Sequence, residues 1–139
     1  MDYKKFGNTI FARFDKGEEI MESLKKVADK ENIKLAHINA LGAADEVTAG
    51  VYNPETKEYH SNSFKGDYEI ISLHGTITTK DGEYYPHLHI CIGDEKGNAY
   101  GGHLNKAVIA ATCEMIITLI DGKVDRMLDK NVGLNVFKF

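Results

Sequence analysis

Cysteine is scarce in this sequence. Cys91 and Cys113 are the only two, they form no C-x-x-C pair, and they provide no disulfide framework. Long hydrophobic runs are missing as well, so no segment approaches the length of a membrane span, and the polar N-terminus does not resemble a signal peptide. We therefore expect a reduced, cytoplasmic protein without a membrane-spanning segment.

Positive charge is also in short supply. The chain has 17 Lys and Arg against 21 Asp and Glu, which gives a net charge of −4. Because nucleic-acid phosphates are bound by clustered basic side chains, this balance disfavours non-specific nucleic-acid binding as the main role and leaves room only for a local basic patch. The 139 residues are 42% hydrophobic, contain no linkers or repeats, and suit one domain over residues 1–139.

The most informative stretch runs from Tyr84 to Leu104 and holds three of the six histidines. His87 and His89 lie two apart in a run that alternates as a strand does, so their side chains point to the same face. The opposite face carries apolar residues, which we expect in the core: Leu88, Ile90 and Ile92. This strand therefore has an apolar side and a histidine side.

A second strand after the turn at 94–98 returns His103 toward the first two histidines. Three imidazoles from adjacent strands can hold one metal ion, and zinc with three protein ligands and an open position is typical of a reactive site. Gly101 and Gly102 precede His103 and remove side chains where another segment must come close or where the strand bulges. The alternative is that these histidines are polar residues facing water, but we favour a metal site with His87, His89 and His103 as ligands.

The remaining pattern predicts an α+β fold with a mainly antiparallel sheet and one covering helix near the N-terminus. The helix is expected over about 17–31, with Asp15 as its N-cap and Glu18 completing a capping box. The segments expected to form strands are 9–14, 34–41, 46–52, a short one near Tyr59, 68–79, 86–93, the one with His103, 112–120, and a closing strand at 134–139.

Two carboxylates are candidates for catalysis. Glu69 and Glu114 each interrupt an otherwise apolar strand, and a buried carboxylate without a partner is costly. Each is therefore expected to form a salt bridge or backbone hydrogen bonds, or else to act as a base on water beside the metal. Cys91 shares the strand face of His87 and His89, so it can approach the ion, although a buried thiol is the commoner outcome.

Several other residues are weaker candidates. His74 is expected to be structural or to line the same pocket, and Tyr84, Tyr85 and Tyr100 are expected to line a small-molecule pocket or a subunit interface. The two arginines, Arg13 and Arg126, can each bind an anionic ligand, and the sequence does not choose between them. We interpret His37 and His60 as ordinary polar positions.

Segments spread over nearly the whole chain resemble the PPC domain, the "plants and prokaryotes conserved" domain. The matching segments are Gly17-Glu18-Glu19-Ile20, Leu41-Gly42-Ala43, Gly50-x-Tyr52, Gly66 to Ile71, His87-x-His89 and Gly101-Gly102-His103-Leu104. The resemblance implies an α+β domain that forms a homotrimer and carries the label "predicted DNA-binding protein". In plants the domain is joined to AT-hook motifs, and this chain has no AT-hook.

The resemblance also suggests two further roles. In plant members the segment that matches Gly66 to Ile71 contacts partner proteins, so an interaction role follows, although Asp67 replaces a basic residue here. The domain is also similar in fold to acetolactate decarboxylase, whose zinc is held by a His-x-His pair and a third histidine; His87, His89 and His103 match that arrangement.

Three functional hypotheses result. The first is a metal-binding domain with a regulatory or ligand-binding role and a DNA-binding family label. The second is a metal-dependent enzyme of lyase or hydrolase type that acts on a small acid or carbonyl compound, with zinc or a similar divalent transition metal as the ion. The third is an interaction module in which the histidines lie at the trimer interface.

Overall fold

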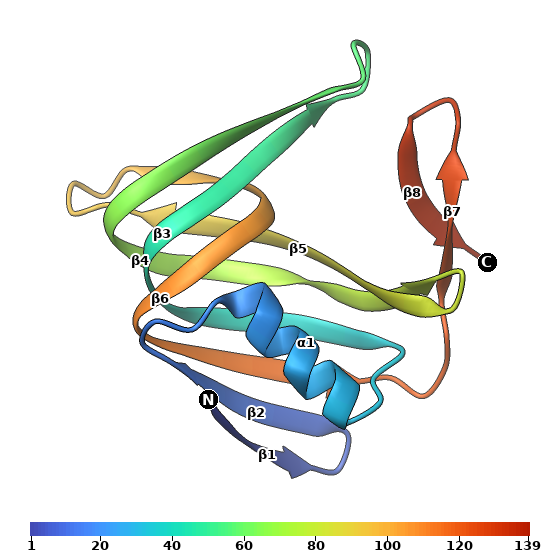
Figure 1. Ribbon diagram of the computed structural model, residues 1–139, viewed down its shortest axis with the longest axis horizontal. Helices are drawn as coiled ribbons and strands as arrows, with labels where there is room; N and C mark the ends of the chain where they lie inside the picture. Colours follow the sequence, from blue (N-terminus) through green and yellow to red (C-terminus); the bar gives the residue numbers. More distant parts are fainter.

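Antiparallel strands dominate the structure, a computed structural model that describes residues 1–139 (Figure 1). The fold class predicted from the sequence, α+β with a mainly antiparallel sheet, is confirmed. The elements in chain order are β1 (Asp2–Phe6), β2 (Thr9–Asp15), α1 (Ile20–Lys30), β3 (Ala36–Asn53), β4 (Glu58–Lys80), β5 (Glu83–Gly93), β6 (Ala99–Leu119), β7 (Asp125–Asp129) and β8 (Leu134–Lys138).

The main sheet has the order β1-β2-β6-β3-β4-β5, and β5 also pairs with β6. The last four strands of that order therefore curl back on themselves. The long strand β6 makes this closure possible, because residues 99–103 pair with β5 while residues 112–118 pair with β2. One consequence is that β5 and the start of β6, which carry the histidines, become neighbours.

The hydrophobic core fills the inner side of this curled sheet. Twenty-six buried apolar residues form one cluster, to which α1 contributes Ile20, Leu24, Val27 and Ala28. These helix residues follow the spacing expected of one apolar face, and α1 lies across the sheet against β6 (Figure 1). The helix is too short and too polar to cross a membrane.

The start of α1 differs from the sequence prediction. The helix begins at Ile20, and its N-cap is Glu19, whose Oε2 accepts a hydrogen bond from the Glu22 backbone N–H at 2.8 Å. Only half of the predicted capping box forms, because Glu18 Oε2 accepts from the Asp15 N–H at 2.7 Å while the Asp15 side chain binds Arg13 and the Met1 amino group instead. The Gly17 N–H donates to the carbonyl of Ile109 in β6 at 2.8 Å, so Gly17 is bound to the sheet and is not part of the helix.

Replacing Glu19 with alanine is expected to destabilise the fold by about 2 kcal/mol, because one side chain serves two backbone groups. Its second oxygen, Oε1, accepts the Ala107 N–H of β6 at 3.0 Å. The variant loses the cap and leaves that strand N–H without its partner. Chemical denaturation measures the change, and Glu22→Ala, which removes no cap, is the control; equal midpoints for both variants would contradict the expectation.

In three places, two strands predicted separately from the sequence form a single continuous strand. The predicted strands 34–41 and 46–52 form one long strand, β3, which the register shifts around Gly42 bend without ending it. A Cβ atom at Gly42 would lie 2.3 Å from the Thr112 carbonyl oxygen, so only glycine permits this contact between β3 and β6. In the same way, β4 includes both the strand predicted near Tyr59 and the one predicted at 68–79, and β6 includes both the His103 strand and the one predicted at 112–120. Strand β1 was not predicted from the sequence.

The strand predicted at 134–139 is present as β8, but it does not close the main sheet. Strand β8 pairs only with β7, in a separate two-stranded sheet that stands apart from the main one (Figure 1). The hairpin is attached where the Thr79 N–H donates to the Val124 carbonyl at 3.0 Å and Thr79 Oγ1 donates to Asp125 at 2.8 Å. This attachment places β7 and β8 beside the histidine face of β5.

Candidate metal centre

Three histidines converge on the outer face of β5 and β6. His87 and His89 share one face of β5, while Leu88, Ile90 and Ile92 are buried on the other, as their alternation predicts. His103 lies directly opposite His89 in the register of β5 with β6. The hairpin pairing predicted from the sequence is therefore confirmed.

The donor atoms of His87, His89 and His103 lie within 4.8 Å of one another. Their ring centroids are 5.1–5.7 Å apart. In tetrahedral zinc coordination, ligand nitrogens lie about 3.4 Å apart, so small side-chain rotations bring all three onto one ion. The set can hold a metal ion, and imidazole is a ligand that several divalent transition metals accept, zinc among them.

Burial keeps two of these imidazoles neutral, which is the form that binds metals. Burial lowers the pKa of His87 to about 4, with smaller contributions from His103, Arg126 and His89. Burial likewise lowers the pKa of His103, and the neighbouring His89 adds to the effect. At neutral pH both rings therefore carry a free nitrogen lone pair.

Glycines behind the site allow the strands to approach closely, as the Gly-Gly pair before His103 predicts. A Cβ at Gly101 would lie 2.3 Å from the Ile90 carbonyl oxygen, and one at Gly102 would lie 2.5 Å from that of Gly50. Gly50 in turn leaves room for the ring of Tyr59. Tyr59 lies edge-on to His103, and its hydroxyl donates to Asn105 Oδ1 at 2.6 Å.

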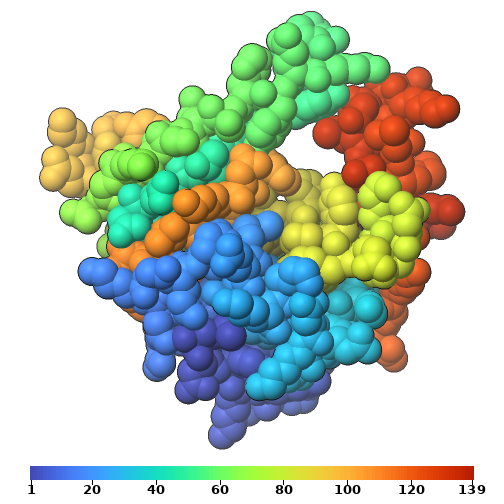
Figure 2. All heavy atoms as spheres, in the orientation of Figure 1, coloured from blue at the N-terminus to red at the C-terminus, as the bar shows by residue number.

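The triad opens into a cavity of about 800 Å³ between three hairpins. Figure 2 shows this hollow between the green β3–β4 hairpin, the yellow β4–β5 segment and the red C-terminal hairpin. The lining residues are Gly50, Val51, Tyr52, Pro54, Tyr59, Tyr85, His87, His89, Gly102, His103, Asn105, Arg126, Leu134 and Asn135. A space of this size accommodates a small-molecule ligand.

The tips of the β3–β4 hairpin and the C-terminal β7–β8 hairpin meet and close one side of the cavity. Tyr52 Oη donates to the Val132 carbonyl at 2.9 Å, and Lys57 Nζ donates to the Lys130 carbonyl at 3.2 Å. On the opposite side, Asn135 Nδ2 donates to Tyr85 Oη at 3.3 Å. The C-terminal hairpin is thus a wall of the cavity, a role that no local sequence signal indicates.

The candidate carboxylates lie elsewhere. Glu69 and Glu114 are both exposed, so the burial on which their candidacy rested is absent. Glu114 lines a different hollow beside β2 and β3, and neither residue lines the histidine cavity. Their catalytic role stays an untested prediction that the geometry of this chain does not support.

The three candidate tyrosines and Cys91 lie in different places relative to the cavity. Of the three tyrosines only Tyr85 lines the cavity, since Tyr84 packs against the core and Tyr100 packs on Phe64. Burial raises the pKa of Tyr84, whose hydroxyl has no hydrogen-bond partner. Cys91 is half-buried and lies outside the histidine cluster.

The remaining histidines also stay outside the cluster. His74 pairs in register with His89 on the same sheet face but does not line the cavity. His37 and His60 are exposed, as ordinary polar positions would be. Arg126 lines the cavity, whereas Arg13 lines the other hollow, beside β2 and β3.

Comparisons with known proteins agree with this fold. A family model described as the Plants and Prokaryotes Conserved (PCC) domain matches residues 1–121. No curated protein matches the chain significantly. Solved structures match it over nearly its full length.

Three of these structures are informative. A "putative DNA binding protein" from Bacteroides thetaiotaomicron is 31% identical with a TM-score of 0.96, over 99% of this chain and 96% of that one. A "metal-containing protein" from Archaeoglobus fulgidus is 29% identical with a TM-score of 0.89, over 100% and 99%. A plant- and prokaryote-conserved (PPC) protein from Pyrococcus horikoshii is 33% identical with a TM-score of 0.86, over 99% and 95%.

Proposed function

Because the chain belongs to the Plants and Prokaryotes Conserved (PCC) domain family, we propose that it binds one divalent transition metal ion, preferably zinc, and that this ion contacts a small-molecule ligand in the cavity. The convergence of His87, His89 and His103 at the edge of a cavity carries this proposal. The similar protein from Archaeoglobus fulgidus, which is called metal-containing, supports it. When bound, such an ion supplies a Lewis acid with an open coordination position.

Ligand binding is the version of this function that the cavity supports best. No Asp or Glu lines it, so a lyase or hydrolase reaction would need its proton transfers from hydroxyl groups such as those of Tyr59 and Tyr85. A metal-dependent enzyme acting on a small acid or carbonyl compound remains the second candidate, because three ligands leave a coordination position facing the cavity. Ligand binding, by contrast, needs no proton-transfer group in addition to the residues that line the cavity.

Elemental analysis of protein purified without a histidine tag tests the proposal. We expect about one zinc or similar ion per chain, removable with a chelator and restored by added metal. A chain that stays metal-free after reconstitution contradicts the proposal. A screen of small acids and carbonyl compounds with the loaded protein then separates the enzyme from the ligand-binding domain.

DNA binding, which the name of the Bacteroides protein suggests, is expected to be weak in this chain. At physiological salt we expect no shift of an AT-rich duplex at protein concentrations up to about 100 μM, since non-specific binding depends on clustered basic groups and the net charge is −4. An electrophoretic or anisotropy titration measures this. A saturable, salt-sensitive complex in the low micromolar range would contradict the expectation.

We further propose that the protein is a homotrimer. Phe11, Leu41 and Ile116 are 53%, 57% and 38% exposed on neighbouring strands, and they line a second hollow of about 560 Å³. Such an apolar surface suits contact with further copies of the chain. Light scattering is expected to give about three times the 15.5 kDa of one chain.

Charge substitutions on that surface test the trimer. Leu41→Glu is expected to release monomers because it buries a charge in the contact. Met127→Glu, at a residue 50% exposed on the C-terminal hairpin, is the control and should leave the mass unchanged. A monomeric parent protein, or a Leu41→Glu variant that keeps the parental mass, would contradict the proposal.

A further inference from the structure

Arg126 is the one charged residue that the fold buries. Its side chain begins in β7 and is only 5% exposed, whereas every other Lys, Arg, Asp and Glu keeps more contact with solvent. Arginine almost never lies this deep without a partner of opposite charge. Its surroundings therefore need an explanation.

Neutral groups hold the guanidinium of Arg126 in place. Nε donates to Thr78 Oγ1 at 2.8 Å, and Nη1 donates to the Asn135 carbonyl at 2.9 Å. The guanidinium carbon lies 4.8 Å from the ring centroid of Tyr85 and 4.5 Å from that of Phe137. These contacts fix its orientation, but none of them neutralises its charge.

No carboxylate compensates that charge. Arg126 forms no ion pair with any Asp or Glu, and the cavity that it lines contains neither residue type. Its Nη2 group donates to no atom of the chain, and Arg126 lines the cavity, so Nη2 is available to a ligand there. A buried cation with one open edge calls for an anion from outside the chain.

We propose that Arg126 is the anion-binding residue of the histidine cavity and that its ligand is a small acid whose carboxylate or phosphate oxygens accept hydrogen bonds from the guanidinium. Three histidines and one arginine give this cavity no negative charge of its own, although the chain as a whole carries −4. The inference rests on the proposed function only in placing the acid beside the metal; the anion contact itself does not require the ion.

The C-terminal hairpin then selects the ligand. It supplies Arg126, Leu134 and Asn135 to the cavity, and it lies beyond residues 1–121, the part that the family model matches. The metal ligands come from β5 and β6 inside that part. The candidate metal ligands are thus paired with a separate wall that carries the charge recognition.

NMR of the intact protein tests this contact directly, because a chain with two arginines gives only two Arg Nε–H signals. Propionate is titrated into 15N-labelled protein, both zinc-loaded and chelator-treated, with the uncharged propionamide as the matched probe and inorganic phosphate as a separate arm. We expect an anion to shift the Arg126 signal and propionamide to leave it in place. The arm that saturates at lower concentration, propionate or phosphate, identifies the anionic group.

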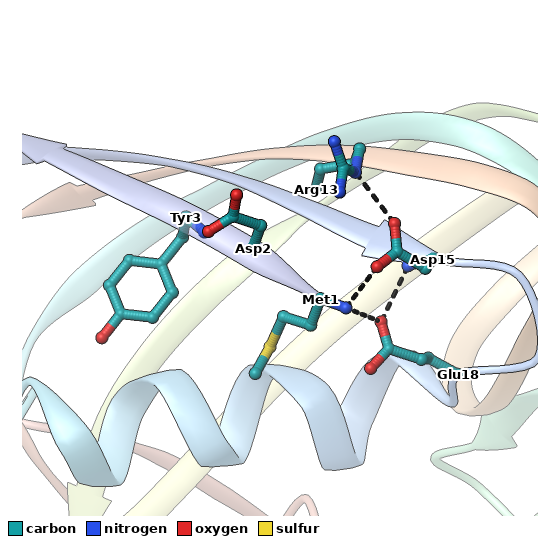
Figure 3. A network of polar contacts seen from close by, with 6 residues as sticks. All are labelled: Met1, Asp2, Tyr3, Arg13, Asp15 and Glu18. Carbon is teal, nitrogen blue, oxygen red and sulfur yellow. Dashed lines mark hydrogen bonds and ion pairs between the residues drawn. The ribbon is translucent and has the colours of Figure 1, made fainter.

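Arg13 provides the matched control. It is exposed and donates from Nε to Asp15 at 2.8 Å, within the surface network that also includes Met1 and Glu18 (Figure 3). Arg126→Gln is expected to weaken anion binding about tenfold or more, since charge-assisted hydrogen bonds are lost, while Arg13→Gln keeps the parental affinity. Circular dichroism confirms that each variant is folded.

Specific outcomes overturn the inference: an Arg126 signal that neither anion moves, a folded Arg126→Gln variant with parental affinity, or equal shifts with propionamide. If Arg126→Gln does not fold, Arg126→Lys is tested instead, because lysine keeps the positive charge but lacks the planar guanidinium with its paired N–H donors. Severalfold weaker anion binding by Arg126→Lys supports the inference, and unchanged binding overturns it. The His87→Ala/His89→Ala variant separates the two proposals. A retained Arg126 response in that variant supports the anion site even if no metal is ever found.

Discussion

Replacing His87 and His89 together with alanine is expected to reduce the bound metal from about one ion per chain to none. The two residues supply two of the three imidazoles whose donor atoms lie within 4.8 Å of one another. His103 alone then remains, and one histidine on a strand cannot retain a transition metal against a chelator. Elemental analysis of the parent and the variant, purified identically and without a tag, measures the loss.

His74→Ala is the control for this experiment. His74 is exposed, lies directly opposite His89 in the β4–β5 pairing, and stays outside the cluster. Its loss is therefore expected to leave the metal content unchanged. A double variant that keeps its metal, or a His74→Ala variant that loses it, would move the site away from the three assigned histidines.

The same variants separate the metal site from the interaction module. If the histidines served the trimer interface instead, the double substitution would change the mass in solution and not the metal content. We expect the opposite result, because the apolar hollow that supports the trimer proposal is lined by β1, β2, β3 and β6 and contains none of the three histidines. Light scattering beside the elemental analysis distinguishes the two outcomes.

Replacing Gly75 with alanine is expected to destabilise the fold by about 3 kcal/mol, which lowers the melting temperature by about 10 °C. A Cβ at this position would lie 2.0 Å from the His87 carbonyl oxygen and 2.8 Å from the Leu88 Cα. Both are backbone atoms, so relief of the clash requires β4 and β5 to separate. Because that shift moves His87, weaker metal binding is expected as well.

Gly93→Ala is the matched control for Gly75→Ala. Its new Cβ would meet the Ile71 Cδ1 atom at 2.8 Å, but Ile71 is 57% exposed and its side chain can rotate away. We expect a cost of about 1 kcal/mol or less for this variant. Thermal unfolding of metal-free protein gives the comparison without a contribution from bound ions. Equal melting temperatures for the two variants would show that the β4–β5 contact is not as tight as the structure indicates.

The histidine face of β5 was predictable because strand alternation is a local property. His87 and His89 are separated by Leu88, and a period of two places the imidazoles on one side and the leucine in the core. The turn before the next strand was equally readable, which brought His103 opposite His89. The apolar spacing of α1 gave the covering helix in the same way, although its first residue shifted to Ile20.

Strand continuity was less predictable. The interruption at Gly42 resembles a strand end in the sequence, yet β3 continues through it because glycine lets β6 approach within contact distance. Local propensity marks the glycine but does not say whether the chain turns or bends there. The pairing partner decides, and it lies about seventy residues away.

The sequence by itself determined the type of fold, the apolar core and the three metal-ligand candidates, since each depends on residues close together in the chain. Only the tertiary structure decided which arginine joins them, whereas Tyr85 shares the strand face of His87 and His89. Arg126 faces the cavity because the C-terminal hairpin docks on β4, through long-range contacts whose energies depend on the whole assembled surface. Local patterns carry no record of such docking, because packing between distant segments has no period in the sequence.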